Sequence, residues 1–66
     1  MKLDLFQDAI VNRDFLEYNI TKGDIVILND YITAPIGEEV CVVEIYTATE
    51  KFVGVAILPF DSIESI

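Results

Sequence analysis

Three apolar runs decide the fold that we expect of this chain: Ile25-Val26-Ile27-Leu28, Val40-Cys41-Val42-Val43 and Val53-Gly54-Val55-Ala56-Ile57-Leu58. Each run has the length of a strand and is rich in β-branched residues, and turn-forming residues separate it from the next. The runs therefore predict a compact all-β domain.

Working outward from these runs, the chain divides into five expected strands joined by short links. We expect the strands at Asp8–Val11, Asp24–Asn29, Glu39–Tyr46, Phe52–Leu58 and Glu64–Ile66. Short links favour an antiparallel meander that closes into a small barrel. Residues 1–66 have room for a single domain of this kind.

Four features of the links predict how the strands are joined. Gly23 precedes a strand and is free to take a positive φ. The segment Ala34-Pro35-Ile36-Gly37 has Pro second and Gly fourth, as a type I turn prefers. Asp14-Phe15-Leu16-Glu17 has the spacing of a helix cap and predicts at most one helical or 3₁₀ turn. Pro59 should end its strand, because it has no N–H for the ladder.

The composition limits how the domain is stabilised and where it works. Hydrophobic residues make up 53% of the 66 residues, and Cys41 is the single cysteine. An internal disulfide and a Cys/His zinc site are therefore excluded, and an unpaired thiol suits a reducing compartment. The N-terminus resembles no signal peptide and no stretch has the length of a membrane span, so we expect a cytoplasmic protein that does not contact membranes.

Acidic residues dominate the charge. Twelve Asp and Glu against four Lys and Arg give a net charge of −8. This charge repels phosphates, which argues against direct nucleic-acid binding, and steers the chain toward basic surfaces. It also keeps an apolar small protein in solution, and the sequence leaves both interpretations open.

The sequence indicates no catalytic or metal chemistry. The chain has no histidine, the usual acid–base group at neutral pH. Glu38 and Glu39 follow a turn glycine and should be solvated, while Cys41 lies among valines with no base to activate it. Asp24, Asp30, Glu38 and Glu39 follow no ligand spacing, so we expect an acidic rim without a metal. The protein is therefore not expected to be an enzyme or to hold a cofactor.

The strands carry apolar side chains on both faces. In Glu39–Tyr46, one face holds Val43 between Cys41 and Ile45, and the other holds Val42, Glu44 and Tyr46. One face must line the core, and we place Val43 and Val55 inside. The other is an exposed patch unless the opposite barrel wall, the Asn12–Lys22 connection or a partner covers it.

An acidic rim around an apolar centre suits a protein interface. We expect the apolar contact to comprise Val42, Glu44, Tyr46, Phe52 and Leu58, with Glu38, Glu39 and Glu50 around it.

Four segments together resemble a known family: Asp8-Ala9-Ile10-Val11, Ile20-Thr21-Lys22-Gly23-Asp24-Ile25-Val26, Val42-Val43-Glu44-Ile45-Tyr46 and Ala56-Ile57-Leu58-Pro59. Their order from Phe6 to Ile66 resembles the DUF4926 family of small bacterial, often cyanobacterial, proteins. The resemblance implies a five-stranded SH3-like barrel encoded beside a toxin-like or nuclease-like partner. It implies no activity.

We therefore expect a small acidic protein-binding module. Its most concrete form is an antitoxin or immunity-type inhibitor that covers a basic, nucleic-acid-processing partner. The alternative is a homo-oligomeric scaffold, such as a homodimer, in which the second face closes on itself.

Overall fold

The computed structural model describes residues 4–47, 49 and 51–66. Within them the chain is all-β, with the strands β1 (Asp8–Val11), β2 (Ile25–Thr33), β3 (Glu39–Tyr46), β4 (Phe52–Pro59) and β5 (Ile63–Ser65). Two 3₁₀ turns, η1 (Leu16–Tyr18) and η2 (Phe60–Ser62), precede β2 and β5. The five expected strands are confirmed, although their ends differ: β2 is Ile25–Thr33 and continues beyond Asn29, β4 includes Pro59, and β5 begins and ends one residue earlier than expected.

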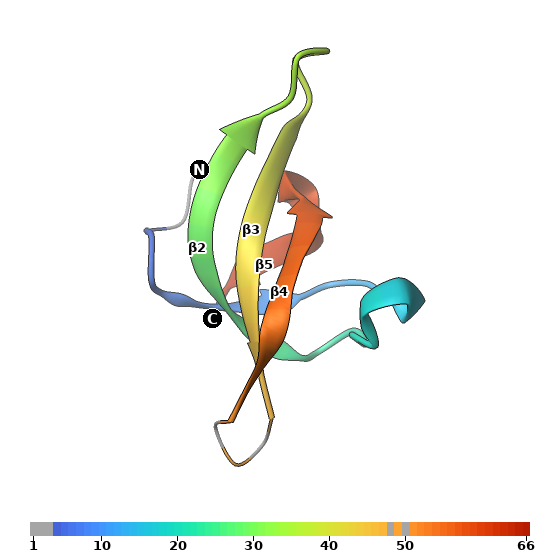
Figure 1. The fold of residues 1–66 in the computed structure, drawn as a ribbon, viewed down its shortest axis with the longest axis vertical. Helices are drawn as coiled ribbons and strands as arrows, with labels where there is room; N and C mark the ends of the chain where they lie inside the picture. The colour runs from blue at the N-terminus through green and yellow to red at the C-terminus, as the bar shows by residue number, and fades with distance from the viewer. Residues whose placement is uncertain (1–3, 48, 50) are drawn as a thin grey trace.

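The strands form one antiparallel sheet in the order β4-β3-β2-β1-β5. Figure 1 shows β2, β3 and β4 side by side, with β1 and β5 crossing behind them. In the described part of the chain no ladder joins β4 to β5, so the expected closure into a barrel is wrong. The last strand, β5, has only three residues, and all three pair with β1. Few of its backbone groups are therefore left to form a ladder with another strand.

A β-bulge in β2 lies between the part of the strand that pairs with both β1 and β3 and the part that pairs with β3 alone. The register between β2 and β3 shifts between Leu28 and Asp30, which leaves Asn29 as the extra residue. The start of β2, Ile25 to Ile27, pairs with β1, whereas pairing with β3 continues to Thr33. Because a bulge bends its strand and increases the local twist, β1 and β5 can fold back over one face.

Glycines form the two turns expected of them. Gly23 has φ +97° and lies in a turn that the Asp24 N–H closes by donating to the Thr21 carbonyl (3.0 Å). Gly37 has φ +86° and donates its N–H to the Ala34 carbonyl at 2.8 Å. Both values lie in the region that favours glycine.

The β1–β2 connection contains the single 3₁₀ turn expected of it, but Asp14 does not cap that turn. The residue before η1 is Phe15, which makes no capping bond through its side chain. Asp14 instead accepts the Lys22 N–H at Oδ1 (2.8 Å), and Phe15 pairs with Ile20 across the loop. These contacts fold the connection onto itself, and Ile20 enters the core.

The core lies between the curved sheet and the elements that fold over its concave side. It comprises Ala9, Val11, Ile20, Val26, Leu28, Cys41, Val43, Ala56, Leu58 and Ile63. The prediction for Val43 is confirmed, but that for Val55 is wrong, since Val55 is 54% exposed. The register explains the difference: Val43 lies opposite Ala56, whereas Val55 lies opposite Glu44 and shares its outward direction.

The two valines give a test of this register. Val43→Ala should lower the free energy of unfolding by about 1–3 kcal/mol, because it leaves a cavity in a fully buried site. Val55→Ala should change it by about 0.5 kcal/mol or less, because the side chain is largely solvated. Urea denaturation of both variants measures the difference. Equal decreases in the free energy of unfolding would contradict the outward direction of Val55 on β4.

Gly23 gives a second test. No atom lies within 4 Å of a Cβ built on Gly23, so a substitution there meets conformational strain and no clash. Gly23→Ala should therefore cost about 1 kcal/mol. Gly54→Ala is the matched control, because Gly54 has equally open surroundings without a positive φ. If both variants had the same thermal midpoint, the strain argument would fail.

Candidate functional site

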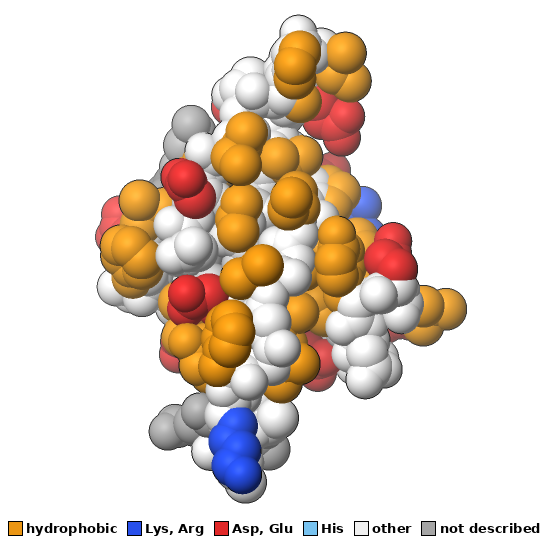
Figure 2. Space-filling view, in the orientation of Figure 1, with side chains coloured by type: hydrophobic (Ala, Val, Ile, Leu, Met, Phe, Trp, Pro, Cys, Tyr) orange, Lys and Arg blue, Asp and Glu red, His pale blue; other side chains and the backbone are white. Residues whose placement is uncertain are grey.

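The face of the sheet turned away from the core is the most distinctive surface of the molecule. We call it the outer face, and it comprises the outward side chains Asp8, Ile25, Ile27, Asp30, Ile32, Val40, Val42, Glu44, Tyr46, Phe52, Val55 and Ile57. Figure 2 shows hydrophobic side chains over β2, β3 and β4, with carboxylates among them and Lys or Arg only at the periphery.

The strand register sets the order of side chains on the outer face. One row runs across β1 to β4 and reads Asp8, Ile27, Glu44, Val55. The next row reads Asp30, Val42, Ile57. Each row thus joins carboxylates to aliphatic side chains that remain in contact with water, such as Val55 and Ile57.

No positive charge offsets these carboxylates within the strands. The sequences of β1 to β4 contain no Lys and no Arg. Asp30 and Glu44 are found on β2 and β3, and Asp8 begins β1. The outer face is therefore both apolar and negatively charged, which suits a ligand that combines aliphatic groups with cations.

An aromatic pair stands at one end of the outer face. The Tyr46 and Phe52 rings meet edge to face, with centroids 5.7 Å apart and planes at 69°. The Tyr46 hydroxyl donates to Oε1 of Glu44 at 3.1 Å. This hydrogen bond, with a smaller effect of desolvation, raises the pKa of Tyr46 above its ordinary value of 10.0. Phe52 is 60% exposed and is the most accessible ring of the pair for a partner.

The structure brings together most of the apolar contact expected from the sequence. Val42, Glu44, Tyr46 and Phe52 share the outer face. Leu58 does not: it is 0% exposed and lies in the core, so its assignment to the interface is wrong. Leu58 pairs with Cys41, and opposite residues of an antiparallel pair point to the same side of the sheet.

The three glutamates expected around this contact have different positions. Glu38 and Glu39 are exposed at the opposite end of β3 from Tyr46, beside the Ala34–Gly37 turn. The Glu38 carbonyl accepts the Ala34 N–H at 2.7 Å. Glu50 lies outside the described residues.

Sequence reasoning missed Asp8, Asp30, Val55 and Ile57 as members of the outer face. Val55 was expected inside the domain, and strand alternation gives Ile57 the same direction as Val55. Asp8 and Asp30 lie on other strands, and only the register places them in line with Glu44 and Val42.

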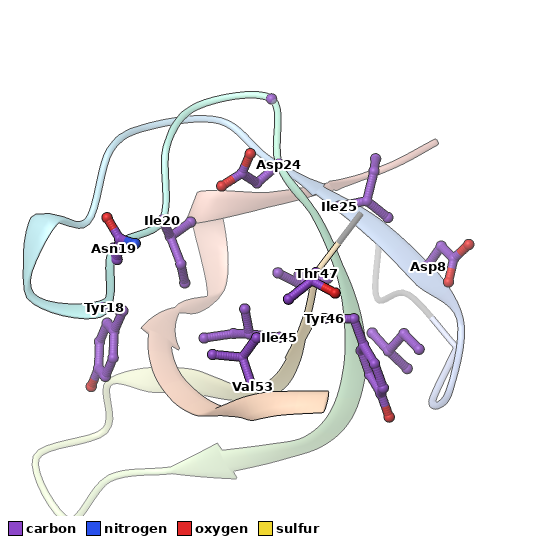
Figure 3. Close-up of a pocket in the computed structure, with 13 residues that line it drawn as sticks. Asp8, Tyr18, Asn19, Ile20, Asp24, Ile25, Ile45, Tyr46, Thr47 and Val53 are labelled. Carbon is purple, nitrogen blue, oxygen red and sulfur yellow. The ribbon is translucent and has the colours of Figure 1, made fainter. Parts of the chain in front are cut away.

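A second candidate is a hollow lined by residues of η1, of the loop that follows it and of the ends of β2, β3 and β4 (Figure 3). Ile20, Ile45 and Val53 point toward one another there, with Tyr18 beside them. Tyr46, Ile25 and Asp8 also line the hollow but lie on the other side of β2 (Figure 3). The hollow is thus a groove around the strand ends and has no enclosed chamber for a small molecule.

The one reactive side chain in the core described by the structure is the Cys41 thiol, and its surroundings keep it protonated. Burial raises the pKa of the Cys41 thiol, which donates to the Leu58 carbonyl at 3.4 Å. A protonated, enclosed thiol is a core group. Among residues 4–47, 49 and 51–66, no group of three or more His, Cys, Asp or Glu side chains is placed to hold a metal ion.

Comparisons of the chain with models of known protein families, with curated proteins and with solved structures found no match. The described residues include no helix whose length and apolar character would allow it to cross a membrane.

The Tyr46–Glu44 bond gives a pH-dependent prediction. Because the folded-state pKa of Tyr46 is raised, the protonated phenol stabilises the fold below pH 10, and this contribution is lost as pH rises through the folded-state value. Glu44→Gln should move the pKa of Tyr46 back toward 10.0, since it removes the accepting carboxylate. An NMR titration of the Tyr46 ring checks this, and an unchanged pKa would contradict the bond.

Proposed function

We propose that this protein is a small acidic binding module that docks a basic protein on its outer face. The observation that carries the proposal is the absence of Lys and Arg from β1 to β4, on a face where Phe52, Val55 and Ile57 remain exposed. Exposed apolar patches on small proteins mark interaction sites, and the carboxylates select a cationic partner.

The specific form of the proposal is an antitoxin or immunity-type inhibitor. A basic, nucleic-acid-processing enzyme must expose cations and stacking groups to its own substrate. A surface of carboxylates and aromatic rings is complementary to such a site. The same carboxylates disfavour direct binding of nucleic acid to this chain. Cys41 is a free, buried thiol, which suits a cytoplasmic location.

The finer fold assignment, an SH3-like arrangement of strands in an open sheet, as implied by the resemblance to DUF4926, belongs to the same proposal. The order of elements supports it: a long first connection, two hairpins, a 3₁₀ turn and a last strand that returns to pair with the first. SH3-like folds have many unrelated functions, so the fold by itself does not indicate the function of this protein, and the outer face does.

A homo-oligomeric scaffold is the alternative. The exposed apolar side chains favour it, because a second copy would cover them. The net charge of −8 on each copy opposes it, since the outer faces of two copies bring like charges together.

The test uses the full chain and, as probe, the basic, nuclease-like protein that the resemblance to DUF4926 implies is encoded by the adjoining gene. We expect the chain to be a monomer by light scattering and to form a stoichiometric complex with the probe. Phe52→Ala should raise the Kd about thirtyfold, as expected for an aromatic anchor worth about 2 kcal/mol, and leave the thermal midpoint unchanged. Glu44→Gln should slow association chiefly at low salt.

The matched control is Leu16→Ala. Leu16 is 83% exposed but belongs to η1, away from the outer face, so this variant should bind like the parent. Equal binding by Phe52→Ala and the parent would contradict the outer-face site. A free homodimer that Phe52→Ala dissociates would favour the scaffold.

A further inference from the structure

Among the described residues, β4 has the longest sheet edge that no other strand covers. β4 lies at one end of the sheet, and no backbone hydrogen bond from the described residues reaches its outer side. The opposite edge, β5, has three residues and includes Glu64. The free side of β2 is blocked at Tyr31, whose N–H donates to Oδ1 of Asp30 at 2.8 Å. Short strands and charges of this kind prevent unwanted pairing, whereas β4 is eight residues long and uncharged.

The register shows which backbone groups of β4 face outward. In an antiparallel pair, alternate residues turn both N–H and C=O toward the neighbouring strand. The Cys41 thiol reaches the Leu58 carbonyl at 3.4 Å, so Leu58 turns its carbonyl toward β3. Val55 and Ile57 alternate with Ala56 and Leu58 along β4, so they turn their N–H and C=O groups away from β3, toward solvent. Pro59 follows the same alternation as Val55 and Ile57, as expected of a residue without an N–H on an edge strand.

The usable edge is short. A register shift at Ile45 and Tyr46 makes Val53 a bulged residue at one end of β4. Pro59 removes a donor at the other end. Between them Val55 and Ile57 offer two donors and two acceptors with strand spacing, enough to bind a short extended segment.

The negative charge of Glu44 indicates which kind of segment would pair with the free edge of β4. A strand added beside β4 would extend the row Asp8, Ile27, Glu44, Val55 by one position. An outward side chain on it would lie about 10 Å from Glu44, two strand spacings away, which a lysine and the glutamate span together. A second copy of this chain would bring no cation on its β4. The outward positions of the complementary segment are therefore cationic, and its alternate positions, which lie beside the apolar core-side residues Gly54, Ala56 and Leu58, are aliphatic.

We propose that β4 accepts an extended, basic-aliphatic segment of the partner protein as a sixth strand, bound through the backbone of Val55 and Ile57. This proposal rests on the proposed function and specifies how the partner is engaged. Backbone bonds would supply general affinity for an extended chain, and Glu44 with the exposed valine and isoleucine side chains would select its sequence.

The first experiment follows amide hydrogen exchange by NMR with a blocked peptide of alternating Lys and Val, about seven residues long. The control peptide has the same composition with its Lys and Val residues in separate blocks. We expect the alternating peptide to slow exchange at the Val55 and Ile57 amides, about tenfold or more, with the Ala56 and Leu58 amides protected in both states. Equal binding of the two peptides would show charge attraction alone and would overturn the proposal.

The second experiment compares Ile57→Pro with Ile57→Ala. Proline removes the outward N–H without removing a donor from the β3–β4 ladder, whereas alanine keeps that N–H and shortens the side chain. Loss of peptide binding by about tenfold in Ile57→Pro, with a much smaller loss in Ile57→Ala, supports strand addition. If Ile57→Pro does not fold, the exchange measurement on the parent chain decides.

Three other results would overturn the proposal that a basic segment of the partner occupies the β4 edge. Peptide binding that shifts Phe52 and Val42 resonances without protecting the Val55 and Ile57 amides would leave the outer face as the site and exclude the edge. Protection that rises with protein concentration in the absence of peptide would identify a second copy as the occupant. Absence of peptide binding alongside a stable complex with the adjoining-gene protein would reject the edge and retain the proposed function.

Discussion

The long strands of the sheet are apolar on both sides, but residues 4–47, 49 and 51–66 cover only one of its two faces, and the rest of the structure follows from this difference. Small domains bury a smaller share of their surface than large ones. Here β1, β5 and the Ile20 loop cover one face, and the bulge at Asn29 allows β2 to reach both halves of the sheet. The other face stays in water with its isoleucines and valines exposed.

The covered face is stabilised by a small but well-satisfied core. Cys41, Val43 and Leu58 are fully buried, and the Ser62 hydroxyl donates to the Pro59 carbonyl at 2.6 Å. Among the described residues no buried side-chain nitrogen or oxygen lacks a hydrogen-bond partner. On the surface, Arg13 pairs with Asp61 at 3.0 Å, an exposed ion pair that adds little stability but joins the β1–β2 connection to η2.

The uncovered face and the uncovered edge meet at β4. Val55 and Ile57 contribute side chains to the outer face and, by the alternation of the strand, backbone groups to the edge. A partner that added a strand would therefore meet both surfaces at once. Glu44, one strand inward, accepts a bond from Tyr46 and keeps a carboxylate close to that junction. Because β1 to β4 carry carboxylates and no Lys or Arg, this region is negatively charged.

The sequence by itself determined the strand content, because β-branched runs separated by Gly23 and by the Ala34–Gly37 turn have few other conformations. It also determined which residues of β3 share a face, since strand alternation has a period of two. Only the tertiary structure decided which apolar face of β4 is buried and that the sheet stays open. Alternation shows which residues of a strand share a face, but when both faces are apolar it does not show which one is buried. The pairing of Val55 with Glu44, which decides this, depends on how β3 and β4 align with each other. For the same reason Leu58 belongs to the core and Asp8 and Asp30 to the candidate site.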